Sequence, residues 1–415
     1  MTTFRLNAKT STSGTLRRAS LLASFLLGLS LAGGSVEAQT FTVLHQFHRG
    51  ADGKFPYDAL FRDSAGNLYG STGGGGSFGY GTVFEITAQG KERVLHSFWG
   101  GDGLDLWGNL VRDSAGNLYG TAVDGGTIEQ GQCLHGCGTV FKLDSMGKLT
   151  VLHAFTGGTD GGQPQAGLLR DSAGNLYGTT TIGGDLTCGY GSGCGVVFKI
   201  DQNGKQTVLH AFSGSADGWR PGGGLIRDKA GNFYGVTGGG GAGYGTVYKL
   251  DPSGKETVLY SFPGGSTGAY PVGRLVLDSK GNLYGATQDG GGSCFCGVVF
   301  KLDKRGHESV RHSFTGNPDG AYPELGLTGD GAGNLYGVTY AGGGSTNCYG
   351  IGCGSVFKVD ASGHETVLHG FTGGSDGRIP FGGLILDKSG IFIIPPLWAA
   401  ICHAARAPVA AWSSS

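Results

Sequence analysis

Residues 66–98 read GNLYGSTGGGGSFGYGTVFEITAQGKERVLHSF and decide the fold. Three short runs rich in Leu, Tyr, Val and Phe favour strands, and Gly-rich or turn-forming segments separate them. The stretch lacks the sustained 3.6-residue periodicity of a helix. It therefore predicts three strands of an antiparallel sheet.

The same phrases recur along the chain in a fixed order. Gly-Leu-x-x-Asp (strand A), Asn-Leu-Tyr-Gly (B), Thr-Val-Phe-Lys (C) and Val-Leu-His-x-Phe (D) return every 50 to 57 residues. Such a period indicates a repeat architecture. Tight turns such as 63–67 and 251–255 join A to B and C to D, and each contains a Gly suited to a left-handed position. Long Gly-rich loops join B to C and D to A.

This pattern predicts an all-β fold, a β-propeller of four-stranded antiparallel blades. The tight turns then share one face, and the variable B–C and D–A loops share the other. A lone D strand at 41–47, six full sets and a seventh A strand at 383–387 favour seven blades, in which the N-terminal strand closes the last, incomplete blade. Strands B and D are both apolar, so we expect both to be buried between neighbouring blades.

The two ends of the chain differ from the repeat region, 39–390. Residues 1–38 read as a signal peptide, with Arg17 and Arg18 before the apolar run 21–31 and a small-residue cleavage site at 36–38. Residues 391–415 form an aberrant, non-repeat tail, which we interpret as the result of a frameshift or truncation. The alternative is a hydrophobic anchor, which Pro395 and Pro396 disfavour.

Composition excludes some partners. The formal charge is −1 with 15% charged residues, and no basic run is present, so we expect no nucleic-acid partner. The 87 glycines recur at fixed offsets, which indicates turns rather than a disordered glycine-rich segment. No apolar run in the repeat region is long enough to span a membrane, and we expect a monomer.

The phrases Gly-Asn-Leu-Tyr-Gly and Gly-Thr-Val-Phe-Lys, spaced as above over residues 41–390, resemble the GloVer tandem-repeat (choice-of-anchor) family of bacterial extracellular proteins. The resemblance implies a secreted or cell-surface location and no established activity. The chain departs from the family in lacking a recognisable anchor. The Asp-x-x-Gly-Asn-Leu-Tyr hairpin also resembles blades of NHL-type propellers.

Eight of the nine cysteines occur in pairs within B–C loops. Pairing within an exported chain predicts local disulfides. Bridging across a single residue strains the geometry, so the Cys294/Cys296 pair is the doubtful case. Metal binding is the alternative, but two thiols per loop are too few for a zinc site. The pairs are Cys133/Cys137, Cys188/Cys194, Cys294/Cys296 and Cys348/Cys353.

Two polar residues repeat in nearly every unit. The His of strand D is replaced only by Tyr260, which suits a structural hydrogen bond better than a metal ligand or a catalytic base. The Asp-Gly pairs of the D–A loops are more typical of turns than of calcium loops. We therefore expect both to be structural.

Aromatic residues gather in the variable loops and form a candidate binding face. Rings on a rigid scaffold can stack on sugars or anchor a protein partner, although they can also seal the seams between blades. The candidates are Tyr80, Trp107, Tyr190, Trp219, Tyr244, Tyr270, Phe295, Tyr322 and Tyr349.

The sequence favours a non-catalytic secreted protein that binds a glycan or a protein and needs no cofactor or metal. It contains no Ser/His/Asp grouping or metalloprotease helix, and its polar residues repeat, whereas an enzyme site must differ from its copies. The alternatives are a metal-dependent lactonase- or lyase-like propeller enzyme and a structural envelope component.

Overall fold

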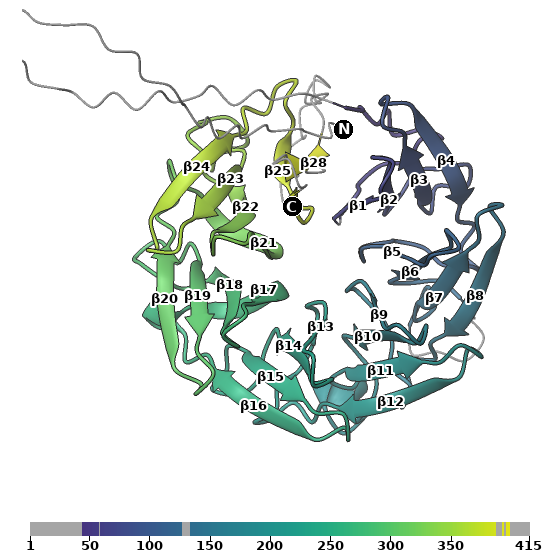
Figure 1. Cartoon of the computed structure of the whole chain (residues 1–415), viewed down its shortest axis with the longest axis horizontal. Helices are drawn as coiled ribbons and strands as arrows, with labels where there is room; N and C mark the ends of the chain where they lie inside the picture. Colours follow the sequence, from purple (N-terminus) through teal and green to yellow (C-terminus); the bar gives the residue numbers. More distant parts are fainter. Residues whose placement is uncertain (1–43, 58, 127–132, 387–391, 394–395, 399–415) are drawn as a thin grey trace, which may run out of the picture.

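The computed structural model describes residues 44–57, 59–126, 133–386, 392–393 and 396–398. Its strands form antiparallel sheets of four, which lie side by side around a central axis (Figure 1). In each sheet the first strand is nearest the axis and the fourth lies on the outer rim. The predicted all-β, propeller-like arrangement is confirmed.

Six sets of four antiparallel strands follow one another along the described chain; the first four sets are separate sheets, and the last two are joined in one eight-stranded sheet. The first three are β1 (Phe61–Arg62), β2 (Leu68–Thr72), β3 (Thr82–Ile86) and β4 (Glu92–Ser97); β5 (Val111–Arg112), β6 (Leu118–Ala122), β7 (Thr139–Leu143) and β8 (Leu149–Ala154); and β9 (Leu169–Arg170), β10 (Leu176–Thr180), β11 (Val196–Ile200) and β12 (Gln206–Ala211). The next three are β13 (Ile226–Arg227), β14 (Phe233–Thr237), β15 (Thr246–Leu250) and β16 (Glu256–Ser261); β17 (Ala269–Leu277), β18 (Leu283–Asp289), β19 (Val298–Leu302) and β20 (Glu308–Ser313); and β21 (Ala321–Gly329), β22 (Leu335–Ala341), β23 (Ser355–Val359) and β24 (Glu365–Gly370).

Short elements complete this pattern. Two turns of 3-10 helix, η1 (Gly189–Gly191) and η2 (Gly265–Thr267), lie in loops. A single parallel pairing, Arg274 with Gly326, links β17 to β21.

Two separate two-stranded sheets follow. One pairs β25 (Arg378–Pro380) with β28 (Pro396–Trp398), and the other pairs β26 (Ile385–Leu386) with β27 (Phe392–Ile393). The pair Ile385–Ile393 has the same eight-residue offset as Phe61–Tyr69 in the first sheet. Residues 392–393 and 396–398, expected to lie outside the repeat, thus form strands, and 392–393 lie at the strand B position.

The A–B turn explains the Asp-x-x-Gly-Asn-Leu-Tyr phrase. Asp63 accepts hydrogen bonds from the backbone N–H groups of Ala65 and Asn67, at 3.0 and 2.8 Å, and from the Asn67 side chain at 3.1 Å. The Tyr69 hydroxyl lies between the same carboxylate, at 3.3 Å, and the carboxylate of Glu85, at 2.9 Å. Gly66 has a φ of 89°, the predicted left-handed position. One carboxylate therefore holds both the turn and the strand that follows it.

Neighbouring sheets pack through aromatic rings. The Phe after each outer strand meets the aromatic residue of strand C in the next sheet edge-on, as Phe98 meets Phe141 with ring centroids 5.1 Å apart. The strand B glycine faces the same ring, because a Cβ on Gly120 would lie 2.6 Å from Phe141. Glycine is required there by this close approach.

The outer strands are less buried than we expected. All five residues of β2 and of β3 are buried, whereas β4 and the other outer strands are half-buried or exposed. The prediction of equal burial for strands B and D is therefore wrong for strand D, because strand D forms the rim of each sheet.

Some predictions fall outside the described residues. These are the signal peptide, 1–38, the start of the lone strand at 41–43, and most of the tail. Residues 44–47 are described but carry no strand assignment.

Candidate functional site

Each D–A loop ends in an Asp-Gly-x-x-Pro phrase or a close variant. The second residue after the Gly, which precedes a Pro in six units and Leu106 in the second, is in the left-handed region in all seven units, although none of these residues is Gly. Non-Gly residues rarely adopt this conformation, and they retain it only where their surroundings impose it. The seven residues, with φ between 53° and 59°, are Phe55, Asp105, Gln163, Arg220, Tyr270, Tyr322 and Ile379.

The preceding sheet imposes this conformation. The backbone N–H of Gln163 donates to the carbonyl of Cys137 at 2.7 Å, and Tyr270 donates to Tyr244 at 2.9 Å. The acceptor in each case is the last residue of the B–C loop of the sheet before. The B–C loop of one sheet thus fixes the D–A loop of the next.

The residue two positions later is thereby placed at the axis. A cavity of about 370 Å³ opens on the loop face, and it is lined by this residue from every unit. We call it the axial cavity. The seven equivalent residues are Tyr57, Trp107, Gln165, Gly222, Val272, Glu324 and Phe381.

Aromatic rings form one wall of the axial cavity. The ring of Tyr57 lies 5.4 Å from that of Trp107 and 5.6 Å from that of Phe381. Trp107 donates its indole N–H to Asp105 at 2.8 Å, which fixes the ring. Burial, and then the charge of Asp105, raises the pKa of Tyr57, so its hydroxyl is neutral and available as a donor.

The side of the cavity formed by the fourth unit has little side-chain bulk. Gly222, Gly223 and Gly238 line it. A Cβ added to Gly222 would meet its nearest neighbour, Oε1 of Gln165, at 3.7 Å, an ordinary contact. This part of the wall therefore has room for a larger side chain or for a ligand.

Glu324 is the one carboxyl group among the seven equivalent residues. It is 8% exposed, and its Oε1 accepts a hydrogen bond from Gln288 at 3.1 Å. Burial raises its pKa to about 7, and the nearby charge of Asp289 acts in the same direction. The cavity thus joins flat apolar rings to one carboxyl group, to the guanidinium group of Arg220 and to the amide groups of Gln165 and Gln288. Among the described residues, no three His, Cys, Asp or Glu side chains come together as a metal-binding group.

The predicted aromatic residues separate into three groups. Trp107, Trp219 and Tyr270 line the axial cavity. Arg220 lies over the ring of Trp219 at 4.8 Å from its centroid. The exposed rings that do not line it are Tyr80, Tyr190, Tyr244, Phe295 and Tyr349, at 45%, 111%, 40%, 60% and 85% exposure, and Tyr322 is half-buried against the core.

Tyr80 and Tyr244 have a packing role. In each sheet the second cysteine of the B–C loop, or one of these tyrosines, stands directly before the Gly that opens strand C. A Cβ on Gly264 would lie 2.9 Å from the ring of Tyr244, and one on Gly373 would lie 2.9 Å from Sγ of Cys348. The two tyrosines therefore occupy the place that a disulfide takes in the other sheets.

All four expected disulfides are present. Cys133 bonds to Cys137, Cys188 to Cys194, Cys294 to Cys296 and Cys348 to Cys353, with Cα–Cα distances of 5.2 to 5.6 Å. The Cys294–Cys296 bond, which we expected to be strained, is among them. The disulfides fasten the same B–C loops whose carbonyl groups fix the next D–A loop.

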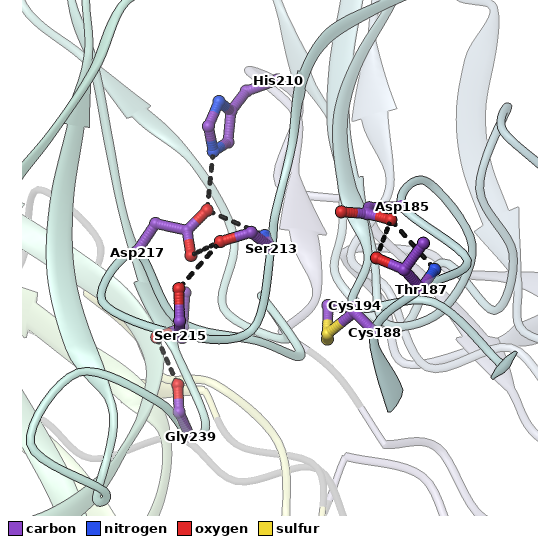
Figure 2. Close-up of a disulfide and its surroundings, with 10 residues drawn as sticks. Asp185, Thr187, Cys188, Cys194, His210, Ser213, Ser215, Asp217 and Gly239 are labelled. Carbon is purple, nitrogen blue, oxygen red and sulfur yellow. Dashed lines mark hydrogen bonds and ion pairs between the residues drawn. A yellow bond between two sulfur atoms is a disulfide. The ribbon is translucent and has the colours of Figure 1, made fainter. Parts of the chain in front are cut away.

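The repeated His and Asp residues form pairs that hold each D–A loop. Figure 2 shows one pair beside the Cys188–Cys194 disulfide: Nε2 of His210 lies 3.5 Å from Asp217, which also accepts from the Ser213 hydroxyl at 2.6 Å. In the unit with Tyr260, a Thr replaces this Asp, and Tyr260 hydrogen-bonds to Thr267. The pairs recur in unit after unit, as a structural role requires.

Sequence reasoning missed most of the axial cavity. It found Trp107, Trp219 and Tyr270, but not Tyr57, Gln165, Gly222, Val272, Glu324 or Phe381. The available signal was the position after the Pro, the point at which the repeat changes residue type in every unit.

Solved structures with low sequence identity share parts of this fold. The extracellular domain of a putative hybrid two-component system from B. thetaiotaomicron matches 84% of this chain with 12% identity and a TM-score of 0.53. The chain spans 38% of that domain. A putative 6-phosphogluconolactonase from Bacteroides uniformis matches 77% of this chain and 86% of its own, with 15% identity and a TM-score of 0.48.

A gluconolactonase from Xanthomonas campestris matches 69% of this chain and 84% of its own, with 14% identity and a TM-score of 0.41. No curated protein matches the sequence. No described helix has the length and apolar character of a membrane span.

A family model matches the repeat phrases and the sheets that they form. The model of the Gloeobacter/Verrucomicrobia repeat matches residues 33–191 and 187–393, which together cover most of the chain and nearly all of the sheets described above. The chain belongs to the Gloeobacter/Verrucomicrobia repeat family.

Proposed function

We propose that this chain is a non-catalytic, secreted or cell-surface protein of seven blades that binds a glycan in the axial cavity. One observation carries the proposal. The residue two positions after the left-handed one lines the cavity in every unit, and its type differs in every unit: Tyr, Trp, Gln, Gly, Val, Glu and Phe. A different side chain at each copy of a cavity-lining position fits selection by a ligand, since packing common to all units would favour one residue.

Contacts of the N-terminal segment support a closed ring of seven blades. A Cβ on Gly90, in the C–D turn of the first sheet, would lie 3.6 Å from the carbonyl oxygen of Leu44. Its equivalent Gly147 faces the carbonyl of Leu95, on the outer strand of the preceding sheet, at 3.6 Å. Leu44 therefore stands where the outer strand of a preceding blade belongs.

The aromatic contacts agree. The ring of Phe47 meets Phe84 at 4.9 Å, as Phe98 meets Phe141 in the next sheet. On the axial side, a Cβ on Gly383 in the last unit would lie 2.8 Å from Ala59 in the first. Both edges of the seventh blade thus contact the first sheet.

The chemistry of the axial cavity suits a sugar. The faces of Tyr57, Trp107 and Trp219 offer flat apolar surfaces for the C–H groups of a pyranose ring. Gln165, Gln288 and Glu324 offer amide and carboxyl groups to its hydroxyls. Four disulfides fit an oxidising, extracellular compartment.

Filling the cavity tests the proposal. Gly222→Trp places a large ring in the open part of the wall, and Gly331→Trp adds the same ring on the turn face, where a Cβ meets nothing within 4 Å. We expect purified wild-type protein and the Gly331→Trp variant to retain the same sugars on a glycan array, and the Gly222→Trp variant to lose them. Retention by all three proteins, or by none, would refute binding in this cavity. Hydrolysis of a lactone by the wild type but not by Gly222→Trp would favour the enzyme alternative.

A further inference from the structure

The opposite end of the axis carries an opening of a different character. A cavity of about 780 Å³ on the turn face is lined by Arg112, Arg170, Arg227, Arg274 and Lys229. Two carboxylates, Asp171 and Asp228, line it as well, which leaves a net charge of about +3. We call this opening the arginine mouth. Its positive charge is not apparent from the composition, because the whole chain has a formal charge of −1.

Three of the four arginines come from one position of the repeat. Arg112, Arg170 and Arg227 each precede the turn Asp of strand A, in β5, β9 and β13, whereas Arg274 lies three residues before the equivalent position, in β17. The last three units have Leu277, Gly329 and Leu386 at this position. The positive charge is therefore confined to one side of the ring, which packing common to all units does not require.

Structural contacts use only part of these guanidinium groups. Arg112 Nη1 lies 3.2 Å from Asp63 and its side chain is 27% exposed. Arg227 Nη1 lies 3.8 Å from Asp171 and its side chain is 34% exposed. Asp171 already accepts hydrogen bonds from Asn175 and from Tyr177 at 2.8 to 3.0 Å. Since each guanidinium has five N–H donors, both retain donors for a ligand.

Arg170 lines the mouth between Arg112 and Arg227. Its buried Nε has no hydrogen-bond partner, whereas the equivalent Nε atoms of Arg112 and Arg227 donate to the carbonyls of their turn glycines at 3.4 Å. The Nε therefore faces the protein, and the terminal nitrogens of Arg170 are the donors that a ligand in the mouth would meet. Arg274 donates through Nε to the Leu225 carbonyl at 3.1 Å, and this bond holds the side chain at the mouth.

We propose that the arginine mouth binds an acidic saccharide through its carboxylate. The planar guanidinium fork matches a carboxylate with two parallel hydrogen bonds. The ring of Phe61 also lines the mouth and offers the sugar an apolar face. The site is separate from the axial cavity, because its residues come from A–B turns and strand A rather than from the D–A loops.

Calorimetry with trigalacturonate as the probe tests this site. We expect the wild type to bind it, and Arg170→Gln and Arg274→Gln each to weaken binding about tenfold, the loss of one charge-assisted hydrogen bond. Arg305→Gln, the same change in the C–D turn of the fifth sheet and outside the mouth, should bind as the wild type does. Thermal unfolding checks that each variant is folded.

Three results would overturn the proposal. The first is binding of the methyl-esterified oligomer, which has no charge, with the same affinity as trigalacturonate. The second is displacement of trigalacturonate by an equal concentration of inorganic phosphate. The third is unchanged affinity in both Arg170→Gln and Arg274→Gln. Gly222→Trp separates the two proposals, because it should leave trigalacturonate binding intact while abolishing binding in the axial cavity.

Discussion

The first residue of the outer strand offers a direct test of the electrostatics. Glu256 and Glu365 begin β16 and β24, and each has a buried Oε1 without a hydrogen-bond partner. Burial, followed by the charge of Asp217, raises the pKa of Glu256 to about 7. Burial and the charge of Asp319 do the same for Glu365. At the equivalent position Gln206 donates its amide N–H to the Asp160 carbonyl at 3.1 Å.

The direction of the effect follows from proton linkage. Because the pKa of each Glu is higher in the folded protein than the ordinary value of 4.5, folding takes up a proton between pH 4.5 and about pH 7. The contribution of the protonated group to the free energy of unfolding is full below pH 4.5 and is lost as the pH rises through 7. After allowance for solvent screening of these half-exposed groups, the loss is about 1 kcal/mol per site.

Glu256→Gln and Glu365→Gln should therefore each raise the free energy of unfolding by about 1 kcal/mol near pH 8 and leave it unchanged near pH 4. Gln206→Glu should lower it near pH 8 by a similar amount. Urea unfolding followed by tryptophan fluorescence, with the disulfides intact, measures these values. Glu308→Gln is the matched control: Thr267 replaces the Asp there, and burial alone raises the pKa of Glu308, so its gain should be smaller. An equal gain at both pH values would refute the titration argument.

Three further sets of variants test other parts of the structure. Replacing Cys188 and Cys194 with Ser should cost about 2 kcal/mol of unfolding free energy in urea titrations, and the Cys188→Ser, Cys194→Tyr variant should recover part of that loss by copying the Tyr80 arrangement. His210→Tyr and Asp217→Thr should each lower the free energy of unfolding, but together they copy the Tyr260–Thr267 pair. A double-mutant cycle should therefore give a favourable coupling energy of about 1 kcal/mol. Strict additivity of the two single changes would contradict the pairing. Glycan affinity, measured by calorimetry, should change across the Glu324 pKa of about 7, and Glu324→Gln should abolish that pH dependence.

The repeated features were readable from the sequence. Strands, tight turns and disulfide pairs recur, so each copy corroborates the others. The exchange of His for Tyr260 together with Asp for Thr267 also signalled a contact, although each residue was interpreted separately.

The axial cavity and the arginine mouth were not readable in this way. The cavity is lined by the position whose residue type differs from repeat to repeat. The left-handed residues that position its walls, such as Gln163 and Tyr322, are not glycines and give no local signal in the sequence. Arg112, Arg170 and Arg227 lie 57 or 58 residues apart in the sequence, so no basic run reveals them. The side-by-side arrangement of consecutive sheets brings such distant residues to one opening.

The constrained residue before each Pro has an evolutionary consequence. Since the backbone at this point is held by the neighbouring loop and not by the side chain that follows, recombination between repeats can exchange one facet of the cavity at a time. Ligand preference can then diversify by shuffling whole modules, without any new solution to the folding problem.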